Sequence, residues 1–356
     1  MMHSVSLNVI LLGYATSVSA ELPGSDGTLH CQGSLHCTPT QSPTLTEATT
    51  LVQVPVKLHR RQSVTSETNG SKQVQLQQQV PNELFPLYWV HVPKCGSTFL
   101  NSLMNLPGAC NFDSTGITPE TDIAGLFHGH RQDGLKRPII RKACPGSFSF
   151  DGDCATHSGI GSIYEPVVKG HGLIMLRQPE QRILSGYYHR IHKEPHSWPL
   201  WHYGRSPKNV TEYAKVVSGC AVKILTRQGY AIAQSHWSVD APCGNPTLAV
   251  THEETQIAID RLRAGFIFVG ITEDWDMSIC LFHMMVGGAC HASEFVNSNP
   301  GNRSSGKQYE TSVLDGFTDI YDGALYEEAK RIYAQNLQKY RVSASTCEPC
   351  FQHRNH

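Results

Sequence analysis

The chain repeats one local pattern, in which a short apolar segment ends in a turn and apolar residues then recur at helical spacing. Three such units are present, at residues 85–104, 173–191 and 266–286. Short strands that are apolar throughout are typical of parallel sheets buried on both faces. Because strands alternate with helices, the sequence predicts an α/β fold with a central parallel sheet flanked by helices.

Two further helices are predicted later in the chain. One begins at Thr251, where Glu254 three residues on completes a capping box. The other spans residues 324–340, which have an amphipathic pattern.

The first 20 residues have the pattern of a secretory signal. An apolar run from Val5 to Ala15 is followed by Val18 and Ala20, small residues at the positions that a signal peptidase reads. No Lys or Arg precedes the run, which is short for a membrane span. We expect a cleaved signal peptide, and a short signal anchor in the membrane is the alternative.

The next segment, residues 21–84, contains no Phe, Tyr or Trp and is rich in Ser, Thr, Gln and Pro. Such a segment buries too little apolar surface to offset the entropy lost on ordering. We therefore predict a disordered stem over residues 21–84, one folded domain over residues 85–343 and a tail over residues 344–356.

Cysteines and glycosylation sequons indicate the secretory pathway. The chain has 12 cysteines, which fit an oxidising compartment, and N-glycosylation sequons at Asn69, Asn209 and Asn302. The Golgi lumen or the Golgi membrane is the expected location, and secretion is the alternative.

Neighbouring cysteines suggest local disulfides. Cys280 is expected to pair with Cys290, and Cys347 with Cys350. Cys95 is expected to stay unpaired. Other cysteines have no pairing that the sequence fixes: Cys31 and Cys37, which either pair with each other or stay free, and Cys110, Cys144, Cys154, Cys220 and Cys243.

The charge balance argues against nucleic acid as a partner. Lys and Arg number 29 and Asp and Glu number 30, so no basic surplus is present to bind a polyanion. Any recognition of phosphate must therefore be local.

Residues 93–98, here called the 93–98 loop, follow the first apolar segment and have the composition of an anion-binding turn. Gly96 lets the backbone approach an anion closely. Ser97 and Thr98 supply hydroxyl and N–H groups at a helix start, and Lys94 supplies a positive charge. An ordinary turn with a solvent-facing lysine is the alternative. The loop lacks the G-x-x-x-x-G-K-[ST] spacing of nucleotide triphosphatases.

A second cluster of phosphate-binding residue types follows the second apolar segment. Arg177 comes directly after residues 173–176, and Ser185 lies about two turns into the next helix. An arginine at a strand end and a hydroxyl on the following helix can bind one phosphate from two sides. Arg182 either joins them or has a structural role.

These two segments resemble a known family. Pro-Lys-x-Gly-Ser-Thr from residue 93 and Leu-Arg-x-Pro-x-x-Arg-x-x-Ser-x-Tyr-Tyr from residue 176 are similar to the cofactor motifs of sulfotransferases that use 3′-phosphoadenosine 5′-phosphosulfate (PAPS). The similarity is greatest to the membrane-associated, carbohydrate-modifying branch that includes heparan sulfate 2-O-sulfotransferase. It covers about residues 85–340, with Val-Gly-Ile-Thr-Glu at residues 269–273. Cys95 and Gln178 depart from the Thr and Asp that are usual there.

The resemblance implies a single sulfotransferase domain with a P-loop-like parallel sheet, and a role for each motif. The residues that would bind the 5′-phosphosulfate are Lys94, Cys95, Gly96, Ser97 and Thr98. Arg177 and Ser185 would hold the 3′-phosphate. Arg303, in the turn-rich residues 297–307, would contact the nucleotide, or that segment is a plain surface loop.

The resemblance also implies a catalytic base between the two motifs. Sulfonyl transfer to an alcohol requires the hydroxyl to lose its proton as it attacks, and histidine is suited to this role. His130 is the expected base and His128 the second candidate. A zinc site formed by these histidines with His189 and His192 is the alternative, although the resemblance implies a reaction without metal.

The resemblance implies a glycan acceptor, with protein tyrosine and small alcohols as the alternatives in that order. Aromatic residues in the 195–203 segment are of the kind that stacks on sugars and could line the acceptor site. The same segment equally suits a loop packed over the core. Two other functions remain open, a P-loop kinase or nucleotide hydrolase, and a non-catalytic lumenal binding protein of the same fold.

Overall fold

The computed structural model describes residues 80–128, 139, 142–144, 157, 159–189, 205–228, 243, 249–298 and 308–355, for Phe127, His128 and Asn355 only the backbone. All of them lie in one compact unit. His130, Arg303, the 195–203 segment and most of the predicted stem lie outside the described residues.

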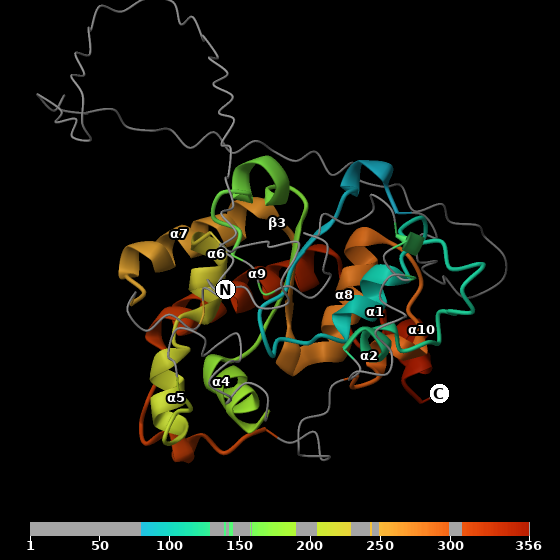
Figure 1. Cartoon of the computed structure of the whole chain (residues 1–356). Helices are drawn as coiled ribbons and strands as arrows, with labels where there is room; N and C mark the ends of the chain where they lie inside the picture. The colour runs from blue at the N-terminus through green and yellow to red at the C-terminus, as the bar shows by residue number, and fades with distance from the viewer. Residues whose placement is uncertain are drawn as a thin grey trace, which may run out of the picture. The chain divides into compact units, whose positions relative to one another are not determined.

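A parallel sheet forms the centre of this unit (Figure 1). Its strands are β1 (Tyr88–Val90), β2 (Gly172–Leu176) and β3 (Phe266–Ile271), in the order β1-β2-β3. Both neighbouring pairs are parallel, and Ile174 of β2 lies opposite Val90 and Val269. The predicted α/β class is confirmed, since each predicted apolar segment contributes one strand.

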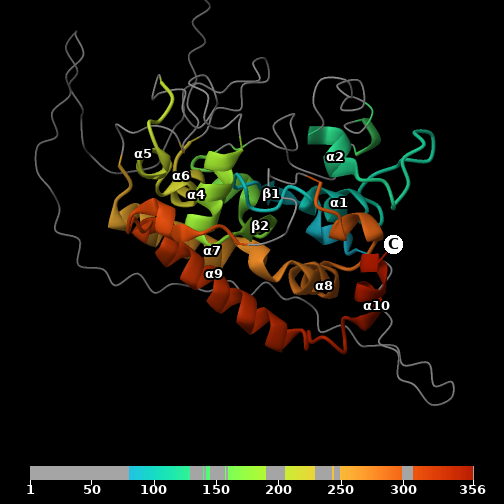
Figure 2. The same ribbon diagram turned by 90° about the horizontal axis from the view of Figure 1, so that it is seen from below.

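Helices separate the strands in the chain, and further helices follow β3. The helices are α1 (Phe99–Met104), α2 (Ile123–His128), α4 (Pro179–Tyr188), α5 (Val210–Val216), α6 (Cys220–Thr226), α7 (His252–Gly265), α8 (Trp275–Val286), α9 (Ile320–Lys339) and α10 (Glu348–Phe351). Short helical turns are at Asn82–Leu84, Tyr164–Val168, Thr272–Asp274, Ala292–Phe295, Thr311–Leu314 and Gln352–Asn355. Helices α7, α8 and α9 contact β3, and Figure 2 shows them below the strands.

Local capping signals fixed two of these helices. The capping box predicted at Thr251 is present, with the Thr251 hydroxyl accepting from the Glu254 N–H and the Glu254 carboxylate accepting from the Thr251 N–H. The last long helix begins at Ile320, four residues before the predicted start, because the Asp319 side chain caps it by accepting from the Asp322 N–H.

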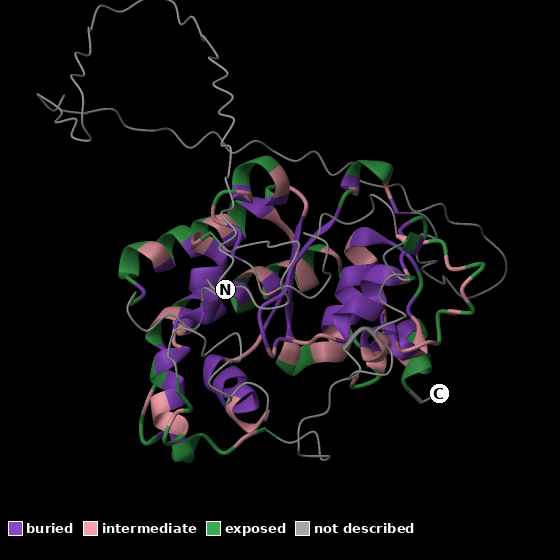
Figure 3. Ribbon diagram, in the orientation of Figure 1, coloured by how far each residue is buried: buried purple, intermediate pink, exposed green. Residues whose placement is uncertain are grey.

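The main core lies between the sheet and the helices, and the buried residues follow the strands and α1 in Figure 3. Phe99 of α1 is stacked on Phe268 of β3 and meets Phe282 of α8 edge-on, with ring centroids 5.4 and 5.0 Å away. Val80 and Leu84 are also buried in this core. The packed structure therefore begins before residue 85, where order was expected to start.

Four disulfides join cysteines within the described residues, and they correct two expectations. Cys110 pairs with Cys144, Cys220 with Cys243, Cys280 with Cys347 and Cys290 with Cys350. The predicted local pairs Cys280–Cys290 and Cys347–Cys350 are therefore wrong, because the chain folds α10 back against α8 and each cysteine meets a partner across that interface. Cys95 is a free thiol, as expected. Cys31, Cys37 and Cys154 lie outside the described residues.

In the part of the chain that is described, no helix is both long enough and apolar enough to cross a membrane.

Candidate functional site

The carboxyl ends of the three parallel strands lie at one edge of the sheet, the edge where open α/β folds bind ligands. The 93–98 loop follows β1, Arg177 follows β2, and Thr272 and Glu273 follow β3. Residues that are far apart in the sequence thus meet at this edge.

The 93–98 loop has an unusual backbone. Lys94 has φ 63° and Gly96 has φ 81°, so two residues of this turn are in the left-handed region. Gly96 is also packed closely, because a Cβ at this position would lie 2.3 Å from Cζ3 of Trp275. Both facts require glycine at position 96. Alternation of handedness around such a turn can point successive N–H groups into a common concavity that suits an anion.

The loop offers unused donors. Among the described residues, the backbone N–H groups of Gly96, Ser97 and Thr98 have no acceptor, whereas the Cys95 N–H donates to the Val92 carbonyl at 3.2 Å. Helix α1 is only six residues long, so the loop itself, and not a helix dipole, is the main source of these donors.

Lys94 lies at the edge of the same turn and is half-buried. Burial, followed by the charge of nearby Arg177, lowers the pKa of Lys94 to about 8. Near neutral pH the Lys94 ammonium is therefore charged but close to its titration range. An anion placed between Lys94 and Arg177 would counteract both effects, because its negative charge favours the ammonium form of Lys94.

Arg177 lies against the 93–98 loop. Its Nη1 donates to the Lys94 carbonyl at 3.4 Å, and its guanidinium lies over the Tyr309 ring, 5.8 Å from the centroid. The structure thus brings together the two predicted anion-binding segments, which are 83 residues apart at this contact.

Glu273 holds the segment around Arg177, a role that the sequence did not reveal. The Glu273 carboxylate accepts from the Gln178 N–H at 3.1 Å and from the Tyr326 hydroxyl at 3.0 Å, and Oε1 lies 3.8 Å from the Arg177 Nε. Thr272 adds a bond from its hydroxyl to the Leu176 carbonyl. The sequence showed Glu273 only as part of the 269–273 motif, without a partner.

Arg182 has a structural role. It is buried, with Nη2 3.1 Å from Asp322 and 3.7 Å from Asp319. These aspartates in turn accept from backbone N–H groups at the start of α6, those of Gly219 and Ala221 among them. Burial and the charge of Asp319 raise the pKa of Asp322 to about 6, although Arg182 opposes this shift. Of the two roles left open for Arg182, the structural one is therefore observed.

Ser185 lies on α4, one turn beyond Arg182, and is buried. Within the described residues no hydrogen bond joins Ser185 to Arg177, so the structure places the pair on adjacent elements without a direct contact.

The Thr98 side chain, which was expected to bind the cofactor, is hydrogen-bonded within the protein. Its hydroxyl donates to the Ser298 hydroxyl at 3.0 Å and accepts from the Ser298 N–H at 3.1 Å. The Thr98 hydroxyl is therefore occupied within the protein, and only its backbone N–H is available to a ligand. The sequence could not show this, because the two residues are 200 positions apart.

Cys95 is buried beneath the loop, and burial raises the pKa of its thiol to about 12. The thiol is neutral and belongs to the core, so Cys95 can serve an anion only through its backbone conformation. His128 is the last residue of α2, and the structure describes its backbone only.

No family model, no curated protein and no solved structure matches the chain. The site is therefore interpreted from its own chemistry.

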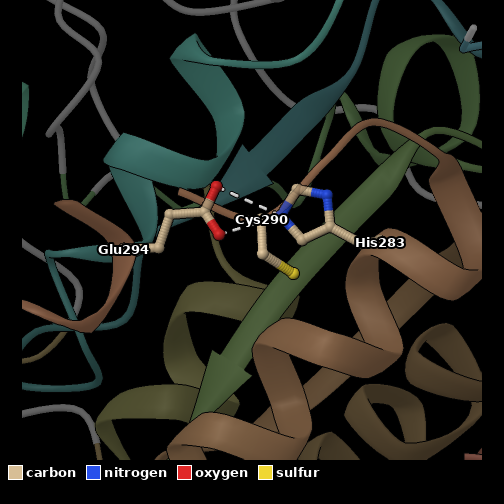
Figure 4. A group of neighbouring side chains, drawn as sticks. All are labelled: His283, Cys290 and Glu294. Atoms are coloured by element: carbon tan, nitrogen blue, oxygen red, sulfur yellow. Dashed lines mark hydrogen bonds and ion pairs between the residues drawn. The ribbon is translucent and has the colours of Figure 1, made fainter. Parts of the chain in front are cut away.

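A cluster of metal-ligating residue types is formed by His283, Cys290 and Glu294 (Figure 4). Cys290 is bonded to Cys350 and so has no thiolate to offer. The two ring nitrogens of His283 lie 3.0 Å from the Gly287 carbonyl and 2.9 Å from the Glu294 carboxylate. Burial alone would lower the pKa of His283, but Glu294 raises it. The arrangement is a buried histidine–carboxylate pair that ties α8 to the following turn.

Proposed function

We propose that the chain is a PAPS-dependent O-sulfotransferase with a P-loop-like sheet, acting in the Golgi lumen on a hydroxyl of a glycan. The observation that carries the proposal is the convergence of two cationic side chains on one turn. Lys94 and Arg177 meet at the carboxyl edge of a parallel sheet, beside backbone N–H groups without a described acceptor.

This geometry suits an extended anion with two phosphate groups. In the proposed complex the 93–98 loop binds the 5′-phosphosulfate, and Arg177 with α4 faces the 3′-phosphate. The lack of any surplus of Lys and Arg over Asp and Glu is consistent with a small ligand of this kind and not with a polyanion.

The proposed reaction is an in-line displacement. His130 removes the proton from the acceptor hydroxyl, and the oxygen forms a bond to sulfur while the bond between sulfur and the 5′-phosphate oxygen breaks. The products are the sulfated acceptor and 3′-phosphoadenosine 5′-phosphate. Lys94 and the loop N–H groups stabilise the negative charge that develops on the leaving phosphate oxygen.

Ligand binding to the purified protein tests the first part of the proposal. Calorimetry should detect 3′-phosphoadenosine 5′-phosphate with higher affinity than ATP, and Lys94→Ala and Arg177→Ala should each weaken that binding. Preferential binding of ATP would favour a kinase or nucleotide hydrolase instead.

Transfer of radiolabelled sulfonyl groups tests the second part. A panel of glycans, with tyrosine peptides and small alcohols as other acceptor classes, should identify a sulfated product. Loss of transfer with retained ligand binding in His130→Ala would support the base. Binding without transfer to any acceptor in the wild type would favour a non-catalytic binding protein.

A further inference from the structure

We propose that Asp122 is a positioning residue that holds the 93–98 loop in its anion-binding conformation. The expected effect of Asp122 on ligand affinity rests on the proposed function, whereas its effect on the conformation of the 93–98 loop can be tested without a ligand. Asp122 comes directly before α2 and belongs to neither motif that the sequence singled out.

The first observation is that one oxygen of Asp122 serves three segments. Its Oδ1 accepts from the Ser298 hydroxyl at 2.7 Å, from Asn101 Nδ2 at 3.0 Å and from the Gly125 N–H at 2.9 Å. These donors belong to the chain after the Ala292–Phe295 turn, to α1 and to α2. Hydrogen bonds to a charged acceptor are stronger than neutral ones, so this carboxylate is well suited to join the three segments.

The second observation is the link from Asp122 to the loop. Because Ser298 donates its hydroxyl proton to Asp122, its oxygen is left to accept from the Thr98 hydroxyl, and its N–H donates back to the Thr98 oxygen. Asp122 thereby sets the direction of the Ser298 hydroxyl. Thr98, the last residue of the 93–98 loop, is fixed through two hydrogen bonds to Ser298.

The third observation is that Asn101 of α1 connects α1 to α2 and to the Ala292–Phe295 turn. Its Oδ1 accepts from the Ala124 N–H at 2.7 Å, and its Nδ2 also donates to the Ser293 carbonyl at 2.7 Å. Asn101 and Ser293 are fully buried, where lost hydrogen bonds are costly. Figure 1 shows α1 and α2 next to each other, in agreement with these contacts.

The hydrogen bonds of Asp122 and Asn101 hold two segments of the proposed site, the 93–98 loop and the start of α2. On one side they hold the 93–98 loop through Thr98. On the other side they hold the start of α2, whose last residue is His128, close in sequence to the proposed base. Displacement of the loop by an ångström is enough to weaken a site that relies on aligned N–H groups.

Cys95 provides a reporter that does not depend on any ligand. Its thiol is free and buried within the loop, so alkylation by iodoacetamide requires the loop to open. We expect Asp122→Ala and Ser298→Ala to increase the rate of Cys95 alkylation in the native protein by about tenfold or more. Peptide mass spectrometry assigns the label to Cys95. Asp122→Asn, which keeps an acceptor oxygen, should show a smaller increase.

The matched control is Asp260, an aspartate on another helix that also accepts a hydrogen bond from a side-chain amide. Asp260 on α7 accepts from Gln256 and pairs with Arg263 but lies far from the loop in sequence and on an exposed helix face. Asp260→Ala should leave Cys95 alkylation unchanged. Glu328→Gln, which removes an ion pair between α7 and α9, controls for a general loss of stability.

The same variants then test the functional consequence. The affinity for 3′-phosphoadenosine 5′-phosphate should fall about tenfold in Asp122→Ala and Ser298→Ala, and the double variant should fall no further than the more affected single variant, since both act on Thr98. Unchanged Cys95 alkylation in both single variants would overturn the proposal. If alkylation rises but the wild type binds no such nucleotide, the positioning role stands and the proposed function fails.

Discussion

At the scale of single residues, the candidate site depends on the unusual backbone and close packing of Lys94 and Gly96. Lys94 has a left-handed backbone and a half-buried amine beside a second cation. Gly96 has a left-handed backbone and contacts an indole ring. The left-handed backbone and the half-buried amine of Lys94 cost stability in the free protein, whereas glycine adopts a positive φ without strain.

The titration of Lys94 predicts how anion binding depends on pH. Because its pKa is lowered from 10.5 to about 8, the ammonium is charged below pH 8 and loses its charge as the pH rises through 8. We expect the affinity for 3′-phosphoadenosine 5′-phosphate to fall between about pH 7 and pH 9. Lys94→Arg stays charged over this range and should flatten the profile in calorimetric titrations. If the affinity of Lys94→Arg decreased with pH as steeply as that of the wild type, the titrating group would be another residue.

Gly96 and Gly116 form a matched pair for testing the loop. Both have positive φ, 81° and 73°, but a Cβ at Gly116 would meet nothing within 4 Å, whereas at Gly96 it would collide with Trp275. Gly116→Ala should lower the free energy of unfolding by about 1 kcal/mol. Gly96→Ala should cost about 1–3 kcal/mol more, because overpacking is added to the backbone strain. Urea denaturation measures both, and equal losses would contradict the tight packing on Trp275.

At the scale of elements, buried charge pairs connect helices that are distant in sequence. Arg182 of α4 pairs with Asp319 and Asp322 at the start of α9, and these aspartates cap α6 through backbone N–H groups. One buried charge cluster thus joins α4, α6 and α9, and α4 is the helix that follows Arg177.

Removal of the arginine alone should leave two buried aspartates without their cation. We expect Arg182→Met to lower the free energy of unfolding by about 3–5 kcal/mol. Arg263→Met removes a half-exposed arginine from Glu328 and should cost about 1 kcal/mol or less. Denaturant titrations of the two variants compare these values, and a small loss for Arg182→Met would refute its structural role.

At the scale of the whole molecule, the C-terminal residues are part of the fold and not a tail. The two disulfides from Cys347 and Cys350 join α10 to Cys280 in α8 and to Cys290 after it, closing loops of 67 and 60 residues. Both sulfurs of each pair are buried. The sequence suggested a local Cys347–Cys350 bridge, which would have left these segments unconnected.

Single serine variants distinguish the two arrangements. In Cys347→Ser the released thiol should be Cys280, and in Cys350→Ser it should be Cys290, as detected by alkylation of the denatured, unreduced protein and peptide mapping. Each variant should also lose about 2–4 kcal/mol of stability, because long loops are no longer closed. Release of Cys350 in Cys347→Ser would instead support a local bridge.

The sequence by itself determined the features that depend on neighbouring residues. Apolar segments predicted the positions of all three strands, the capping box predicted the start of α7, and Gly96 with its flanking residues predicted a turn suited to an anion. Each of these follows from local backbone and side-chain chemistry, which acts over a few residues.

Only the tertiary structure decided which distant groups meet. In the folded chain the Thr98 hydroxyl is hydrogen-bonded to Ser298, and Arg182 pairs with two aspartates near residue 320. Glu273 contacts the segment after β2, and the cysteines pair with partners other than the expected ones. These partners lie roughly 60 to 200 positions apart in the chain. No local rule specifies such pairs, because they result from the path that the whole chain takes around the sheet.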